Sequence, residues 1–255
     1  MVLVVLLGAL AGFVVSNSVR ASRARARRSA AAALAHDTTI VAAGQVEGTV
    51  KRALVPAGQW QATPAADLRR QVRNLAAGTY IDDVLLAQDS ALYRWPEHPG
   101  DVMRVYVEPT STIPGFDARY PQMARDVFAE WSMAGFPLRF TFIFDSASAD
   151  ISVQWRERFD AAEGQRIGLT ERTQTSAFLI AKATVLVANH DSAGRALSST
   201  TVAGIVRHEV GHALGLSHAN DPSSVMYHES ATSTIGASDR ATLRLIYLVP
   251  AGSLK

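Results

Sequence analysis

One stretch of the chain decides the fold: HEVGHALGLSH, from His208 to His218, with Met226 eight residues further on. On a helix, residues four positions apart lie on the same face, so His208 and His212 present their ring nitrogens to one point. Gly215 then lets the chain leave the helix, because glycine tolerates a positive φ without a Cβ penalty. The turn that follows brings back His218. Three neutral imidazoles leave the fourth position of a tetrahedral zinc open to water, which is the arrangement of a catalytic zinc site.

A carboxylate stands beside this ligand set. Glu209 follows His208 by one residue and therefore points about 100° around the helix, next to the metal rather than onto it. There it is placed to act as general base for a zinc-bound water. A bare H-E-x-x-H pattern also occurs by chance, on buried amphipathic helices with incidental histidines, but each added feature makes coincidence rarer by about an order of magnitude. The spacing therefore favours a catalytic zinc site.

The motif and its downstream methionine resemble the signature of the metzincin zinc peptidases. The longer run HEVGHALGLSHANDPSSVMY, from His208 to Tyr227, is similar to the matrixin branch of that family, the matrix-metalloproteinase-like enzymes. Matrixins usually have Ser or Thr after the third histidine and Pro after the Met-Tyr pair, whereas this chain has Ala219 and His228 at those places. The resemblance extends over residues 100–255, and its specific part ends at Tyr227.

The resemblance implies an α+β fold. The expected structure is a zincin/metzincin-like catalytic domain with a twisted mixed sheet, an active-site helix, a Met-turn and a C-terminal helix. Met226 would form an apolar floor below the zinc without being a ligand. An extended substrate would add as one more strand to a strand within residues 176–187, which would form the upper rim of the cleft. Tyr227 and His228 would line the substrate pocket, although His228 is also compatible with a surface turn.

The implied activity is that of a zinc-dependent endopeptidase acting on proteins or peptides. One catalytic Zn²⁺ is expected on His208, His212 and His218, with Glu209 activating the zinc-bound water. Two alternatives stay open: a non-catalytic peptide-binding module on the same fold, and a zinc hydrolase of a non-peptide amide. The intact Glu209 speaks against the first, and the same water could serve the second. The chain is expected to be a monomer.

Composition excludes several other classes of protein. The chain has 255 residues, 48% of them apolar, enough for one catalytic domain and a smaller N-terminal region. It has no cysteine, which rules out disulfides, thiolate-bound zinc and a latency switch based on a thiol. The formal net charge is +2, but residues 1–28 hold five arginines and no acid. Subtracting five from +2 leaves −3 for residues 29–255, so a basic groove for nucleic acid is not expected.

Four segments are expected along the chain. Residues 1–19 are an apolar signal peptide or membrane anchor, with a buried N-terminal helix as the alternative, and residues 20–35 are an Arg/Ala-rich linker. Residues 36–99 resemble a pro-segment, and residues 100–255 form the catalytic domain. The protein is therefore expected to be extracytoplasmic, either secreted or anchored through residues 1–19. The arginines follow the apolar run instead of preceding it, so cleavage and orientation stay open.

Other residues bear on metal binding. Asp82, Asp83 and Asp89 are expected to be solvated loop acids. The alternative is that, without a cysteine, one of these pro-segment carboxylates caps the zinc. Three further histidines stand apart from the motif: His36, His98 and His190. Residues 151–189 contain no histidine, so the second, structural zinc of many matrixins is expected to be missing. Structural Ca²⁺ is compatible with the scattered acids, but no EF-hand-like spacing supports it.

Apolar periodicity predicts the remaining elements. Alternation predicts strands over residues 103–107, 138–144 and 150–155, with the aromatic side chains of 138–144 in the core. Helical spacing predicts a helix from Tyr120 to Trp131, capped by Asp117.

Upstream of these, short strands are expected within 46–55 and a helix over 67–77. Residues 164–175 have the composition of a polar loop, and 176–188 that of further strands. Ser198, Ser199 or Thr200 is expected to cap the active-site helix, and Ser238 the final helix.

Overall fold

The computed structural model describes residues 45–52, 63–97, 102–163, 165–229 and 234–255. All described residues belong to one compact unit, Ala43–Lys255. The expected signal or anchor segment and the Arg/Ala-rich linker lie outside the described residues, as do His36 and His98. No helix of the described ranges is long and apolar enough to span a bilayer.

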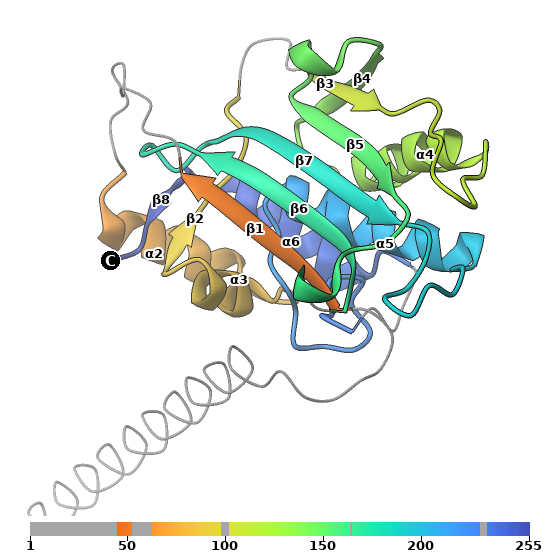
Figure 1. Cartoon of the computed structure of the whole chain (residues 1–255). Helices are drawn as coiled ribbons and strands as arrows, with labels where there is room; N and C mark the ends of the chain where they lie inside the picture. The colour runs from red at the N-terminus through yellow and green to blue at the C-terminus, as the bar shows by residue number, and fades with distance from the viewer. Residues whose placement is uncertain (1–44, 53–62, 98–101, 164, 230–233) are drawn as a thin grey trace, which may run out of the picture. The chain divides into compact units, whose positions relative to one another are not determined.

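A six-stranded mixed sheet organises this unit, with the strand order β1-β6-β7-β5-β3-β4 (Figure 1). Its strands are β1 (Gln45–Arg52), β3 (Val102–Val107), β4 (Arg139–Ile143), β5 (Ile151–Arg156), β6 (Arg166–Gln174) and β7 (Ile180–Ala188). Strands β7, β5, β3 and β4 are parallel to one another, and β6 runs antiparallel to β7. Strand β1 pairs with the outer edge of β6 in parallel.

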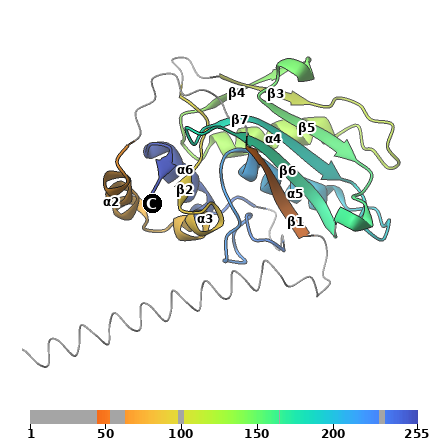
Figure 2. The same cartoon turned by 60° about the vertical axis from the view of Figure 1, so that its left-hand side comes forward.

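Two helices cover the same face of the sheet, as Figure 1 and Figure 2 show. Helix α4 (Tyr120–Ser132) packs on β3 and β4, and helix α5 (Ser199–Ala213) packs on β6 and β7. The inward side of α5 is fully buried, at Val202, Ile205, Val206 and Val210. The Ser198 hydroxyl accepts the Thr201 N–H at 3.1 Å, which confirms the expected cap. Short 3₁₀ turns occupy Ser146–Ser148 and Ala161–Glu163.

The remaining elements gather beside helix α6, which spans Ala237–Leu248 (Figure 2). They are helices α2 (Ala65–Leu75) and α3 (Ile81–Ala87) and the antiparallel pair β2 (Ala91–Leu92) and β8 (Gly252–Ser253). Leu68, Ile81 and Leu92 belong to the same hydrophobic core as the sheet and α6. The hydrophobic core therefore includes residues on both sides of the expected domain boundary near residue 100. The assignment of residues 36–99 to a separate pro-segment stays a prediction. The α+β fold with its mixed sheet, active-site helix and C-terminal helix is confirmed.

The prediction of a polar loop over residues 164–175 is wrong, because β6 occupies most of this segment. Ile167 and Leu169 are buried on one face of β6, and its polar residues on the other face pack against α5. Strand β7 lies between β6 and β5, so it has no free edge. The prediction that a strand within 176–187 offers its edge to a substrate as the rim of the cleft is therefore wrong as well.

Two predicted caps and part of the predicted core also differ. Helix α4 has Arg119 at its N-cap position, and Asp117 binds the Arg119 guanidinium instead. Helix α6 has Gly236 at its N-cap position, so Ser238 lies inside the helix. On β4 and just beyond it, Phe142 and Phe144 are 38% and 93% exposed, because β4 is the outermost strand of the sheet.

Candidate metal centre

Helix α5 and the turn after it bring three imidazoles together. His208, His212 and His218 each offer a ring nitrogen, and these atoms lie within 4.8 Å of one another. The Nε2 atoms of His208 and His212 are 2.9 Å apart. Gly215 has a φ of +114°, and a Cβ there would lie 2.7 Å from the carbonyl oxygen of Tyr93. Glycine is therefore required both for the turn and for the close approach of the Tyr93 backbone.

Backbone carbonyls orient two of these rings. The Nδ1 of His208 lies 2.7 Å from the Val225 oxygen, and the Nδ1 of His212 lies 3.0 Å from the Leu216 oxygen. A carbonyl only accepts, so each Nδ1 carries the proton and each Nε2 of the neutral ring presents a lone pair.

Burial keeps both rings neutral. It lowers the pKa of His208 to about 3 and the pKa of His212 well below its usual value, and repulsion between the neighbouring rings adds to the effect. Two lone pairs facing each other at 2.9 Å repel unless a cation lies between them. The donor set therefore fits a zinc ion.

Glu209 is fully buried beside this cluster, held by two residues of β6. The Thr170 hydroxyl lies 2.6 Å from Oε2 of Glu209, and a Cβ on Gly168 would lie 2.4 Å from Oε1. Burial raises the pKa of Glu209 well above its usual value, and the Thr170 hydroxyl and the Arg166 charge oppose this rise. The carboxylate is not part of the group of candidate ligands and lies beside it.

Sequence reasoning did not find Thr170 and Gly168, because their segment was interpreted as a loop. The β-branched Ile167, Thr170 and Thr173 were the available sign of a strand.

The turn with Met226 packs against α5. Met226 is fully buried, and a Cβ on Gly211 would lie 2.4 Å from its sulfur. Gly211 lies between His208 and His212 on the helix, so the Met226 side chain contacts the turn of helix that carries both rings. Its expected role as the floor of a zinc site stays a prediction.

A buried carboxylate on α6 holds this turn in place. Asp239 accepts hydrogen bonds from the Ser224 hydroxyl, from the Val225 N–H at 3.1 Å and from the Gly236 N–H at 2.7 Å. The carbonyl of Val225 in turn accepts the His208 Nδ1–H. Asp239 thus links the start of α6 to the orientation of a candidate ligand. Sequence reasoning missed this residue, although an acid in the first helical turn after a glycine is a capping signal.

The two expected pocket residues lie close to the cluster. The ring centroids of Tyr227 and His228 are 4.4 Å apart, and the ring centroids of His228 and His218 are 6.5 Å apart. Both side chains are half-buried. Their contact with substrate stays a prediction.

The other candidate metal residues lie elsewhere. Asp83 accepts hydrogen bonds from Asn220, and Asp89 pairs with Lys255. Asp82 is exposed and is not part of the histidine group. The alternative in which one of these aspartates caps the metal is therefore wrong. His190 contacts the side-chain oxygen of Asn189 at 2.7 Å and is likewise outside the group.

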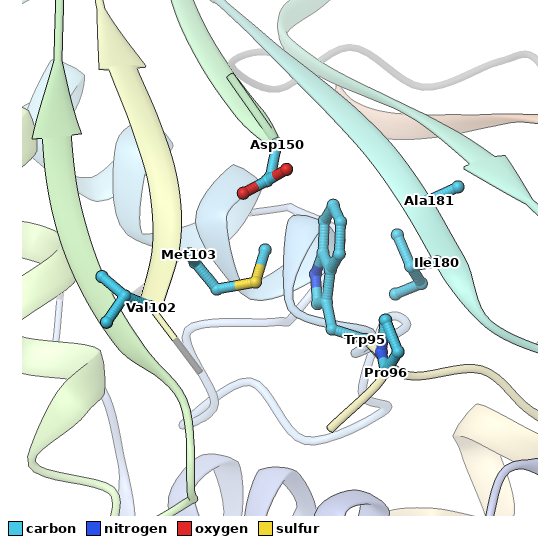
Figure 3. A pocket seen from close by; sticks show the side chains of 7 residues that line it. All are labelled: Trp95, Pro96, Val102, Met103, Asp150, Ile180 and Ala181. Atoms are coloured by element: carbon cyan, nitrogen blue, oxygen red, sulfur yellow. The ribbon is translucent and has the colours of Figure 1, made fainter. Parts of the chain in front are cut away.

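A second concave region lies where β3 and β7 begin (Figure 3). It is lined by Trp95, Pro96, Val102, Met103, Asp150, Ile180 and Ala181. Its carboxylate, Asp150, already accepts hydrogen bonds from the backbone N–H and the guanidinium of Arg104. Its described lining holds no set of metal ligands, so the histidine cluster is the stronger candidate site.

Comparison with known proteins agrees with the geometry. The model of the matrixin family, peptidase family M10, matches residues 106–247, which is more than half of the chain and includes the whole histidine cluster. A search of curated proteins found no match.

Proposed function

This chain belongs to the matrixin family of zinc metallopeptidases, and we propose that it is an endopeptidase that cleaves extended protein segments at internal bonds. The observation that carries the proposal is the convergence of three imidazoles next to a buried carboxylate on one helix and its turn. The carboxylate also argues against a non-catalytic binding module. Burying it costs free energy, and peptide binding alone does not require a buried carboxylate at this place.

The histidines would hold the zinc through ring nitrogens, which the carbonyls of Val225 and Leu216 orient for His208 and His212. Zinc, when bound, supplies a Lewis acid that acidifies a water molecule and polarises the scissile carbonyl. Glu209 takes the proton of the attacking water and later delivers it to the departing amine. Burial raises the pKa of Glu209, which makes its carboxylate a stronger base towards the proton of the water.

The edge of β6 supports an endopeptidase in particular. One edge of β6 pairs with β7, and the other edge pairs only with β1, the last strand of the sheet. A peptide that adds to such an edge is recognised through its backbone and needs no free terminus. The face of β6 turned towards α5 carries Thr170, which contacts Glu209, so a peptide on this edge would lie along the candidate site.

In this chain β1 lies on that edge, parallel to β6 over residues 45–52. We propose that the pro-segment-like region 36–99 acts through β1, which a substrate must displace or which maturation removes. The elements α2, α3 and β2 share the core of the catalytic part. They would therefore stay in place when β1 leaves.

Location and partners follow from the same proposal. A protein or peptide is the expected substrate, and one catalytic zinc is the expected cofactor. We propose an extracytoplasmic monomer, secreted or anchored through residues 1–19, on the basis of the apolar sequence there.

The test compares wild type with Glu209→Ala on an unstructured protein whose two ends are chemically blocked, with and without a zinc chelator. Both proteins should bind one zinc, and only zinc-loaded wild type should cleave, with a loss of about 10²-fold or more in the variant. Asp126→Ala, which removes an exposed carboxylate of α4, is the control and should cleave as wild type does. Equal cleavage by Glu209→Ala would refute the role of Glu209 as general base. Cleavage that requires a free chain end would refute endopeptidase action.

A further inference from the structure

Two residues of β6 make a cradle for the Glu209 carboxylate. Gly168 and Thr170 are two positions apart on one strand, so both face α5. Register with β7 fixes them, since Gly168 pairs with Val187 and Thr170 with Val185. Both partners are fully buried, so the cradle belongs to the rigid sheet and not to a loop.

The hydroxyl of Thr170 selects one carboxylate oxygen. It lies 2.6 Å from Oε2 and 2.9 Å from the backbone oxygen of Glu209, and it has only one proton to donate. The shorter distance falls in the range of charge-assisted O–H···O⁻ bonds, about 2.5 to 2.7 Å. The proton therefore goes to Oε2.

The missing side chain of Gly168 selects the position of the other oxygen. A Cβ at residue 168 would lie 2.4 Å from Oε1 and 3.0 Å from Cδ of Glu209, so any larger residue would displace the carboxylate. Oε1 itself is buried and has no hydrogen-bond partner among the residues that the structure describes. Leaving a buried oxygen without a hydrogen bond costs free energy, and a catalytic role of that oxygen would account for it.

We infer that Thr170 is a positioning residue: its hydroxyl holds Oε2 of Glu209, which keeps Oε1 over Gly168 as the atom that accepts the proton. This inference rests on the proposed peptidase function. In the reaction, the water oxygen bonds to the carbonyl carbon as its proton passes to Oε1. When the C–N bond breaks, that proton passes from Oε1 to the departing nitrogen.

The test uses Thr170→Val, which keeps the side-chain shape and removes the hydroxyl, and Thr170→Ser, which keeps the hydroxyl. The Val variant should lose about tenfold or more in kcat with KM unchanged, because the sheet edge that binds a peptide is intact. The Ser variant should retain most of the wild-type kcat. Thr184→Val makes the same change at a half-buried position of β7 on the opposite face and should match wild type. All should bind one zinc.

A second readout is independent of turnover. Crystal structures of the metal-free proteins should show the Glu209 carboxylate moved away from Gly168 in Thr170→Val and in place in Thr170→Ser. Gly168→Ala should likewise displace the carboxylate and lower kcat while zinc still binds. A Thr170→Val variant with wild-type kcat, or with its carboxylate unmoved, overturns the inference. Zinc-loaded wild type that fails to cleave overturns the proposed function instead.

Discussion

Replacing Asp239 should weaken both the fold and the metal site. In Asp239→Ala, the buried N–H of Val225, the half-buried N–H of Gly236 and the buried hydroxyl of Ser224 lose their acceptor. Each buried donor left without a partner costs about 1 to 3 kcal/mol. The hydroxyl can rotate towards another acceptor but the two N–H groups cannot, so we expect a loss of about 3 to 5 kcal/mol. That is a large part of the total stability of a typical domain, about 5 to 15 kcal/mol.

The same change should reach the candidate zinc ligand. Asp239 fixes the backbone of Val225, whose carbonyl orients the His208 ring. Loss of a group that orients a ligand typically lowers metal affinity by about 10- to 100-fold. Asp239→Asn keeps the shape and one oxygen acceptor, so it should fall between wild type and Asp239→Ala.

Two measurements check this prediction. Urea unfolding of the metal-free proteins gives the change in unfolding free energy, and competition with a chromophoric chelator gives the zinc affinity. Asp126→Ala is the control, because that exposed carboxylate accepts one hydrogen bond from Gln122 on the same helix. A loss below about 1 kcal/mol together with unchanged zinc affinity would refute the role assigned to Asp239.

Three further predictions follow from the same structure. Deleting residues 1–52 removes β1, whereas deleting residues 1–42 keeps it. The protein that lacks β1 should cleave an unstructured protein faster than the one that keeps it. Equal rates would contradict the proposal that β1 blocks the edge of β6. In metal-free protein the His208 pKa is about 3, against about 6.5 for the unfolded ring. The unfolded state takes up that proton first, so the unfolding free energy should fall as the pH drops from about 6.5 towards 3, and a flat urea-midpoint profile would argue against a neutral buried ring. Gly211→Ala places a Cβ 2.4 Å from the Met226 sulfur, so thermal denaturation should show a loss of about 1 to 3 kcal/mol, whereas a stabilised variant would mean that the turn packs elsewhere.

The cluster of three candidate metal ligands was predictable because its geometry is local. His208 and His212 are one helical turn apart, and Gly215 and His218 follow within a single tight turn. Such spacing fixes positions without knowledge of the rest of the fold. The burial of Val202, Ile205 and Val206 followed from helical periodicity in the same way.

The residues that hold Glu209 and the Met226 turn in place were not predictable, because their contacts depend on which separate segments of the chain meet. Strand β6 is rich in polar residues and therefore has the composition of a loop. Two of these polar residues are buried because α5 satisfies them: Thr170 donates to Glu209, and Arg172 donates to the carbonyl of His212. Hydrophobic periodicity does not register polar groups that are buried with partners. The contact of Asp239 with the Met226 turn likewise joins an element start to a turn thirteen residues earlier.

The most direct test of the central claim is a crystal structure of zinc-loaded protein with anomalous data collected on both sides of the zinc absorption edge. One anomalous peak should lie about 2.0 to 2.1 Å from a ring nitrogen of each of His208, His212 and His218. A peak bound by other residues, or no peak from protein crystallised with excess zinc, would contradict the account.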